Sequence, residues 1–303
     1  MNSRVKTIKR ASIIGILGNS FLAIGKIVTG LVTGSLAILG DGFDTATDII
    51  TSIISLVASK IIDKPPDKNH PYGHGRIEII ATQVISFVIF YAGIELARQS
   101  ISRLISKEAL SIQNIAIIVS IVSIAGKFFL AFYKFSAGKK INSQLLIADA
   151  KNMRNDVVLS AGVLVGLLVG KIGGWWWVDS VTALAVSVWI IKVSLSVFLE
   201  GNVELMEGHN NFDDYREIFF VLKDVPSVKN PHKVRIRRIG IMLIVDLDIE
   251  VDKNLSVKEG HDIATAVKNK IMERLENIYD VQVHVEPEGN KEDECYGITH
   301  TEL

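Results

Sequence analysis

The sequence predicts an α-helical membrane bundle of six transmembrane helices, followed by a small α+β domain. Three observations predict this class. The chain of 303 residues is 49% hydrophobic and has a mean hydropathy of +0.33, which is more apolar than is usual for a soluble protein of this length. Its apolar residues are concentrated before about residue 200. After about residue 205 the pattern changes to short amphipathic and alternating segments.

Six segments approach the roughly 20 residues that a helix needs to cross a bilayer. They run at approximately 11–33, 35–60, 77–104, 112–136, 144–170 and 176–199. No small-residue cleavage site follows the basic N-terminus, so the first segment is interpreted as a retained membrane helix. Residues 1–204 are therefore predicted to form the membrane domain.

Basic residues predict the orientation, because Lys and Arg collect on the cytoplasmic side of a membrane. One side collects three groups of them: Arg4, Lys6, Lys9 and Arg10; Lys60, Lys64, Lys68 and Arg76; and Lys134, Lys139 and Lys140. The other side has fewer, with Arg98, Arg103 and Lys171. We expect a multi-pass protein of the plasma membrane with both termini in the cytoplasm.

The tail, residues 205–290, reads as an αββαβ unit. Amphipathic helices are predicted at 212–225 and 256–277, the second opening with a capping box of Ser256 and Glu259. Strands are predicted at 233–240, 242–251 and 281–286, with Gly240 at the turn between the first two. This order gives a small sheet with helices on one face. Residues 291–303 are polar and are expected to be disordered.

The composition excludes several classes of function. The formal net charge is zero, so no basic field indicates nucleic acid. The single cysteine, Cys295, excludes a disulfide framework and a thiolate metal cluster within one chain. No metalloprotease motif, Walker loop or nucleophile elbow occurs at a useful place, so we expect no enzyme.

Two apolar segments carry oxygen-bearing side chains at i, i+3 and i+7. These positions fall within an arc of about 60° on a helix face. A carboxylate at the centre of a bilayer costs about 2.5–3.5 kcal/mol on insertion scales. Several such side chains on one face of a membrane helix therefore indicate a function that requires them. The second segment carries Asp41, Asp44 and Asp48, and the fifth carries Asp149, Asn152 and Asp156.

We interpret the two acidic faces as a divalent-cation site between the second and fifth helices. Two side chains from each helix suit a tetrahedral site, and their all-oxygen set favours Mn²⁺ or Fe²⁺, although Zn²⁺ accepts carboxylates. Alternatively, the carboxylates pair with Lys26, Lys151 or Arg154 and only fix the packing. The proposed ligands are Asp44, Asp48, Asn152 and Asp156.

Asp41 and Asp149 lie one turn nearer the starts of their helices. They are assigned accessory roles, either as a step on the way into or out of the site or as hydrogen-bond acceptors behind the ligands.

A second candidate metal site lies in the loop between the second and third segments. Asp67, His70 and His74 occur within a short loop shaped by Pro and Gly, and Glu78 follows as an accessory residue. The alternative is a loop of solvated histidines.

The tail domain offers a third candidate site. His284 and Glu286 share a face of the last predicted strand. Further metal-binding side chains are distributed over the other elements, and surface histidines without a ligand are the alternative. The full set is His232, Asp246, His261, His284 and Glu286.

Together these features resemble the cation diffusion facilitator family over about residues 5–290. The resemblance rests on six spans, acidic motifs on the second and fifth, the αββαβ tail and the loop motif His70-Pro-Tyr-Gly-His74-Gly-Arg76-Ile-Glu78. It implies a homodimer in the lipid bilayer that exports a divalent cation (zinc, manganese or iron) in exchange for protons. It also implies a ferredoxin-like, metallochaperone-like cytoplasmic domain.

The resemblance assigns roles to the residues at matching positions. The four ligands between the second and fifth helices correspond to the transport site, and the loop and tail sets correspond to further metal sites. Arg76 and Glu207 would form a charge interlock. Zinc-selective members usually carry histidine where this chain has Asn152, which leaves manganese and iron open. Asp246 likewise replaces a histidine of some relatives.

The leading interpretation is a secondary active exporter of divalent cations. The rival is a metal-sensing or scaffold membrane protein with little transport activity, in which the tail domain reports metal.

Overall fold

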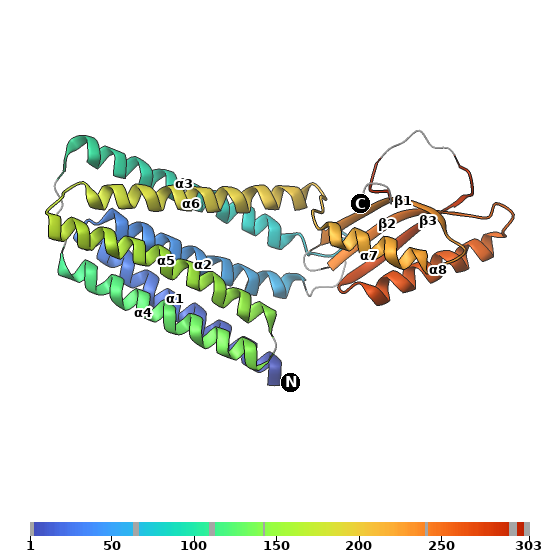
Figure 1. Cartoon of the computed structure of the whole chain (residues 1–303), viewed down its shortest axis with the longest axis horizontal. Coiled ribbons are helices and arrows are strands. Elements are labelled where there is room, and N and C mark those ends of the chain that lie inside the picture. Colours follow the sequence, from blue (N-terminus) through green and yellow to red (C-terminus); the bar gives the residue numbers. More distant parts are fainter. Residues whose placement is uncertain are drawn as a thin grey trace. The chain divides into compact units, whose positions relative to one another are not determined.

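The computed structural model describes residues 3–62, 67–108, 113–141, 143–239, 242–290 and 296–299 (Figure 1). Lys64, Gly240 and Cys295, which enter the predictions above, lie outside these residues. The chain divides into two compact units, the first made of Met1–Ser59 and Ala81–Phe198 and the second of Lys60–Ile80 and Leu199–Leu303.

The membrane part of the chain is helical, as predicted. Its helices are α1 (Ser3–Thr33), α2 (Leu36–Ile62), α3 (Ile77–Ser106), α4 (Asn114–Lys140), α5 (Gln144–Gly173) and α6 (Val178–Leu205). Among the described residues, five helices are long and apolar enough to cross a membrane, namely α1 from Lys9, α3, α4, α5 from Asp149, and α6. Helix α2 has 27 residues but carries three aspartates in its first half. The sixth span therefore stays a prediction.

Side chains of α2, α3, α4, α5 and α6 form the apolar core of the first unit. Ile38 and Leu167 are fully buried in it, and Leu96 and Val186 are nearly so. Helix α4 packs on α1 and α5, with Gly126 against Leu22 of α1. The acidic segment of α5 thereby comes to lie beside α4.

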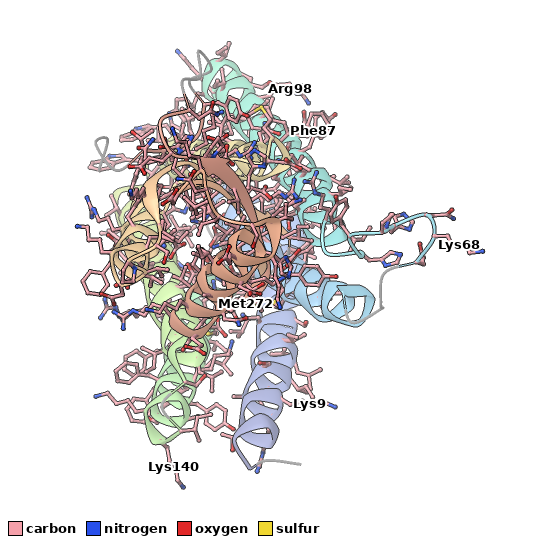
Figure 2. All side chains as sticks on the ribbon, turned by 90° about the vertical axis from the view of Figure 1, so that its right-hand side faces the viewer. Lys9, Lys68, Phe87, Arg98, Lys140 and Met272 are labelled. Atoms are coloured by element: carbon pink, nitrogen blue, oxygen red, sulfur yellow. The ribbon has the colours of Figure 1, made fainter. Side chains whose placement is uncertain are left out.

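The outer surface of the first unit is apolar. Phe21 of α1, Phe87 of α3 and Phe129 of α4 are 76%, 63% and 68% exposed, and Figure 2 labels Phe87 on α3. A continuous surface of large apolar side chains suits contact with lipid. Figure 2 also shows Lys9 of α1 and Lys140 of α4 at the same end of these two helices, as the predicted orientation requires.

A carboxylate of α6 fixes the start of α2. Asp179, which is 2% exposed, accepts a hydrogen bond from the backbone N–H of Leu36 at 2.9 Å and one from the Ser35 hydroxyl at 2.5 Å. It therefore satisfies N–H groups that the first turn of α2 leaves without helical partners. This cap sets the position of the acidic face of α2.

The second unit has the predicted order αββαβ. Its elements are α7 (Phe212–Lys223), β1 (Lys229–Ile239), β2 (Met242–Val251), α8 (Val257–Arg274) and β3 (Ile278–Pro287). The sheet has the order β1-β2-β3, with β1 antiparallel and β3 parallel to β2. Both helices cover the same face of the sheet (Figure 1).

The core of the second unit lies between that face and the helices. Leu247 and Ile249 of β2 pack with Ile218 of α7 and with Val267 and Ile271 of α8. Because side chains alternate along a strand, the even-numbered residues of this part of β2 point to the opposite face.

The predicted capping box at the start of α8 is confirmed. The Ser256 hydroxyl accepts from the Glu259 backbone N–H, and the Glu259 carboxylate accepts from the Ser256 N–H and hydroxyl. These hydrogen bonds hold the pKa of Glu259 below its usual value.

Residues 296–299 of the tail, for which disorder is predicted, form an isolated bridge to β1. Ile298 and Val234 of β1 exchange two backbone hydrogen bonds of 2.9 and 3.1 Å. The free edge of β1 explains the difference, since its unpaired N–H and C=O groups can accept a further extended segment.

Candidate functional site

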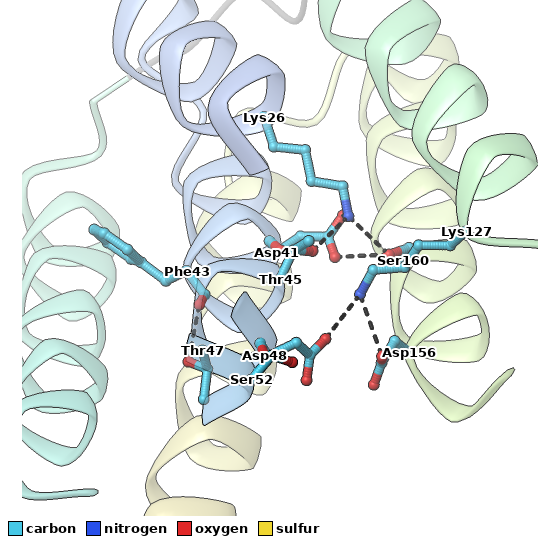
Figure 3. A network of polar contacts seen from close by, with 10 residues as sticks. All are labelled: Lys26, Asp41, Phe43, Thr45, Thr47, Asp48, Ser52, Lys127, Asp156 and Ser160. Carbon is cyan, nitrogen blue, oxygen red and sulfur yellow. Dashed lines mark hydrogen bonds and ion pairs between the residues drawn. The ribbon is translucent and has the colours of Figure 1, made fainter. Parts of the chain in front are cut away.

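Asp41 takes part in a network of ion pairs and hydrogen bonds between α1, α2 and α5 (Figure 3). Its carboxylate lies 2.8 Å from Nζ of Lys26 and accepts a 2.7 Å hydrogen bond from the Ser160 hydroxyl. Lys26 also donates to Ser160 at 3.1 Å and to Thr45 at 3.2 Å. The alternative of pairing with Lys26 therefore applies to Asp41, whose oxygens are already engaged.

Asp48 of α2 and Asp156 of α5 converge on one buried ammonium. Nζ of Lys127, from α4, lies 3.6 Å from Asp48 Oδ2 and 3.4 Å from Asp156 Oδ2 (Figure 3). Lys127 is 0% exposed. The structure thus joins the two i+7 positions of the acidic motifs, with a cation between them.

The two i+3 positions differ from each other. Asp44 lies one turn before Asp48, and its Oδ2 is buried without a hydrogen-bond partner among the described residues. Asn152, one turn before Asp156, is exposed. Lys151 and Arg154, two suggested partners of the carboxylates, are also exposed. The carboxylates of Asp44, Asp48 and Asp156 are therefore partly buried, whereas the amide of Asn152 is exposed.

Asp149 is paired with a second lysine of α4. Nζ of Lys134 lies 2.6 Å from Asp149 Oδ2, and the Lys134 side chain is only 6% exposed. Counting Lys134 as a loop cation in the orientation argument is thus wrong, because α4 continues to Lys140 and buries Lys134 against α5.

Sequence reasoning missed Lys127, although a signal for it exists. Lys127 and Lys134 are seven residues apart on α4, and Asp149 and Asp156 are seven residues apart on α5. Seven residues make about two helical turns, so two antiparallel neighbouring helices with these spacings can form two ion pairs at once. The match between the two spacings becomes visible only when α4 and α5 are considered together.

The loop residues Asp67, His70 and His74 come together as predicted for a metal site. Asp67 Oδ1 lies 3.2 Å from Nδ1 of His70, and Asp67 Oδ2 lies 3.4 Å from Nε2 of His74. Backbone N–H groups of His70 and Asn69 donate to Asp67 and hold its pKa below the usual value. The carboxylate is therefore anionic at neutral pH, as a metal ligand must be. Glu78 lies in the first turn of α3, outside this group.

Three side chains of the tail sheet also come together. One ligand atom from each of His232, Asp248 and Glu286 lies within 4.8 Å of the others. Asp248 is the register partner of His232 on β1 and of His284 on β3. Glu286 lies 3.5 Å from Nε2 of His232 and 3.5 Å from Nε2 of His284. A cavity of about 380 Å³ opens beside Asp248, His284 and Glu286.

Two predicted tail ligands are placed differently. Asp246 faces Arg237 at 3.8 Å and lies outside the three-residue group, where Asp248 stands instead. His261 is exposed on α8, which covers the opposite face of the sheet. Sequence alternation places Asp246 and Asp248 on one face, but only the register selects Asp248.

Arg76 and Glu207, the suggested interlock, lie in contact within the second unit. Arg76 donates a hydrogen bond to Glu207, and Arg237 approaches Glu207 to 3.7 Å. The Arg237 guanidinium also lies over the Tyr72 ring, 5.6 Å from its centroid. These contacts tie the loop before α3 to the end of α6 and to β1.

Comparison with known families gives two matches along the chain. Residues 12–206 match the model of the cation efflux transmembrane domain. Residues 211–288 match the model of the cation efflux protein cytoplasmic domain.

Similar proteins span nearly the whole chain. An uncharacterized transporter of Methanocaldococcus jannaschii is 36% identical over 283 residues, which cover 93% of this chain and 99% of that protein. The manganese efflux system protein MneP of Bacillus subtilis is 29% identical over 292 residues, covering 94% and 98%. A solved metal-bound C-terminal domain of the CzcD transporter from Thermotoga maritima shares 46% identity, covering 27% of this chain and 94% of that one, with a TM-score of 0.26.

The tail site yields a testable prediction. In a fragment of residues 206–303, Asp248→Asn should weaken Zn²⁺ binding at least about tenfold, since even the outer partners of metal ligands are worth about 10–100-fold. Isothermal titration calorimetry measures the change. Asp246→Asn, on the same face of the same strand, is the matched control and should leave the affinity near that of the unchanged fragment. Equal losses from both variants would contradict the assignment.

Proposed function

The chain belongs to the cation diffusion facilitator (cation efflux) family, and we propose that it exports a divalent cation from the cytoplasm in exchange for protons. Membership makes the protein a multi-pass membrane transporter of divalent metal cations. The cation is proposed to bind between α2 and α5, at Asp44, Asp48 and Asp156, with Asn152 as a fourth ligand.

One observation carries the choice of site. Asp48 and Asp156 come from different helices and meet at a buried positive charge, Lys127 Nζ. Buried carboxylates with unpaired lone pairs are costly without a cation, and Asp44 adds a further buried oxygen without a hydrogen bond among the described residues. A divalent cation at this place would satisfy all three.

Proton exchange follows from the chemistry of the ligands. A carboxylate binds metal in its anionic form, so protonation on the outer side weakens binding and favours release. Asn152 carries no titratable proton, and the exchange is therefore assigned to Asp44, Asp48 and Asp156. Rocking of the bundle around this fixed site would expose it to the two sides in turn.

Oxygen ligands guide the choice of metal. Carboxylates suit Mn²⁺ and Fe²⁺, and Zn²⁺ accepts them. The similar protein MneP is a manganese efflux protein, which supports Mn²⁺ among the three.

The second unit is proposed to act as a cytoplasmic dimerisation domain that binds metal. Its His232, Asp248 and Glu286 group would hold a regulatory ion, and Asp67, His70 and His74 would hold another. Metal bound in a homodimer favours whichever arrangement of the subunits it binds more tightly.

The plasma membrane is the proposed location, with both termini in the cytoplasm. Lys9 and Lys140 at one end of α1 and α4 support this orientation (Figure 2).

Transport in proteoliposomes tests the site. Asp48→Asn and Asp156→Asn should each reduce proton-driven Mn²⁺ and Zn²⁺ flux to the level of empty liposomes, because each removes an anionic ligand. Asp149→Asn is the control, since Asp149 lies two turns before Asp156 on α5 and is paired with Lys134 of α4. Flux near that of the unchanged protein in both site variants would refute the site. A purified, folded protein without any proton-coupled flux would favour the metal-sensing or scaffold function.

Asn152 provides a second test. Replacing it with histidine adds a softer nitrogen ligand, so Asn152→His should raise the ratio of Zn²⁺ to Mn²⁺ flux. Competition between the two ions in the same liposomes measures this ratio. An unchanged ratio would show that the residue at this exposed position does not select the metal.

A further inference from the structure

Among the described residues of the bundle, Lys26, Lys127 and Lys134 are buried near acidic side chains, and Lys127 is held differently from the other two. Lys26 lies 2.8 Å from Asp41 and makes two further hydrogen bonds. Lys134 lies 2.6 Å from Asp149. Charge-assisted hydrogen bonds between ammonium and carboxylate groups have lengths of about 2.7–2.9 Å. Both of these lysines are therefore firmly paired.

Lys127 has no such bond. Its Nζ lies 3.4 Å from Asp156 and 3.6 Å from Asp48, and it has no hydrogen-bond partner among the described residues although it is 0% exposed. The facing oxygens of Asp48 and Asp156 also lack hydrogen bonds there. The ammonium thus sits between two carboxylates as a loosely held counter-ion.

An alternative place for this ammonium exists on α4 itself. Ser123 and Ser120 lie one and two turns before Lys127, and both hydroxyls are buried without a hydrogen-bond partner in the described part of the chain. Helical side chains lean toward the N-terminus of their helix, over the preceding turn. The long, flexible side chain of Lys127 can therefore turn away from the carboxylates toward Ser123.

We propose that Lys127 is a tethered counter-ion, which fills the transport site when no metal is bound and is displaced from Asp48 and Asp156 by the incoming divalent cation. This inference rests on the proposed function. In the empty site, Lys127 offsets the repulsion between the carboxylates. When the metal leaves, the returning ammonium competes with it for the same oxygens. This competition lowers the affinity of the site for the metal and favours release.

The strength of this competition sets the expected effect. An opposite charge within about 4–6 Å changes the proton affinity of a carboxylate by about ten- to thousandfold. A divalent cation that must displace the ammonium should experience a comparable penalty.

Mn²⁺ flux measured at a series of concentrations in proteoliposomes tests the proposal. Lys127→Gln should lower the half-saturating Mn²⁺ concentration by about tenfold or more and should also lower the maximal rate, because release becomes slow. Lys134→Gln is the matched control, because Lys134 lies on the same face of α4 but is paired with α5. This variant should leave the half-saturating Mn²⁺ concentration unchanged. Lys127→Arg keeps the charge and should stay close to the unchanged protein.

Half-saturation that is unchanged or raised in folded Lys127→Gln would overturn the proposal, and would mean that Lys127 only holds helices together. If Lys127→Gln does not fold, Ser123→Ala decides: a raised half-saturating concentration supports displacement toward Ser123, and an unchanged one overturns it. Absence of Mn²⁺ and Zn²⁺ flux in the unchanged protein would instead refute the proposed function itself.

Discussion

The apolar helical bundle buries several carboxylates, and their charges govern the polar contacts between its helices. Removing an ion from water costs several kcal/mol even after relaxation, unless opposite charge or hydrogen-bond donors replace the water. The bundle meets this cost with Lys26 for Asp41, Lys134 for Asp149 and the start of α2 for Asp179. Asp48 and Asp156, in contrast, share one lysine, Lys127, at the longer distances of 3.6 and 3.4 Å.

This difference divides the two acidic motifs by role. The first position of each motif is bound to a lysine at hydrogen-bonding distance and serves the architecture of the bundle. The last positions, Asp48 and Asp156, are left with oxygens that lack hydrogen bonds among the described residues. A site that exchanges its cation needs ligands that are incompletely satisfied by the protein, and Asp48 and Asp156 meet this condition as proposed ligands.

Much of the fold could be predicted from the sequence, because hydropathy and alternation reflect burial directly. The αββαβ order and the capping box at Ser256 followed from local pattern. Contacts between segments that are distant in the sequence were harder to predict. Asp248 instead of Asp246 depends on strand register, and Lys127 became visible only when α4 was placed beside α5 with their seven-residue spacings aligned. The apolar run around Lys127 reads as an ordinary membrane helix, since two buried lysines leave most of the 27 residues of α4 apolar.

A divalent cation and the Lys127 ammonium are proposed to occupy the same place in turn. Anomalous diffraction from crystals of the zinc-loaded protein tests it most directly. We expect a zinc peak about 2.0–2.2 Å from oxygens of Asp48 and Asp156, with Nζ of Lys127 moved away from both. Zinc bound elsewhere in the bundle, with Lys127 still between the two carboxylates, would contradict it.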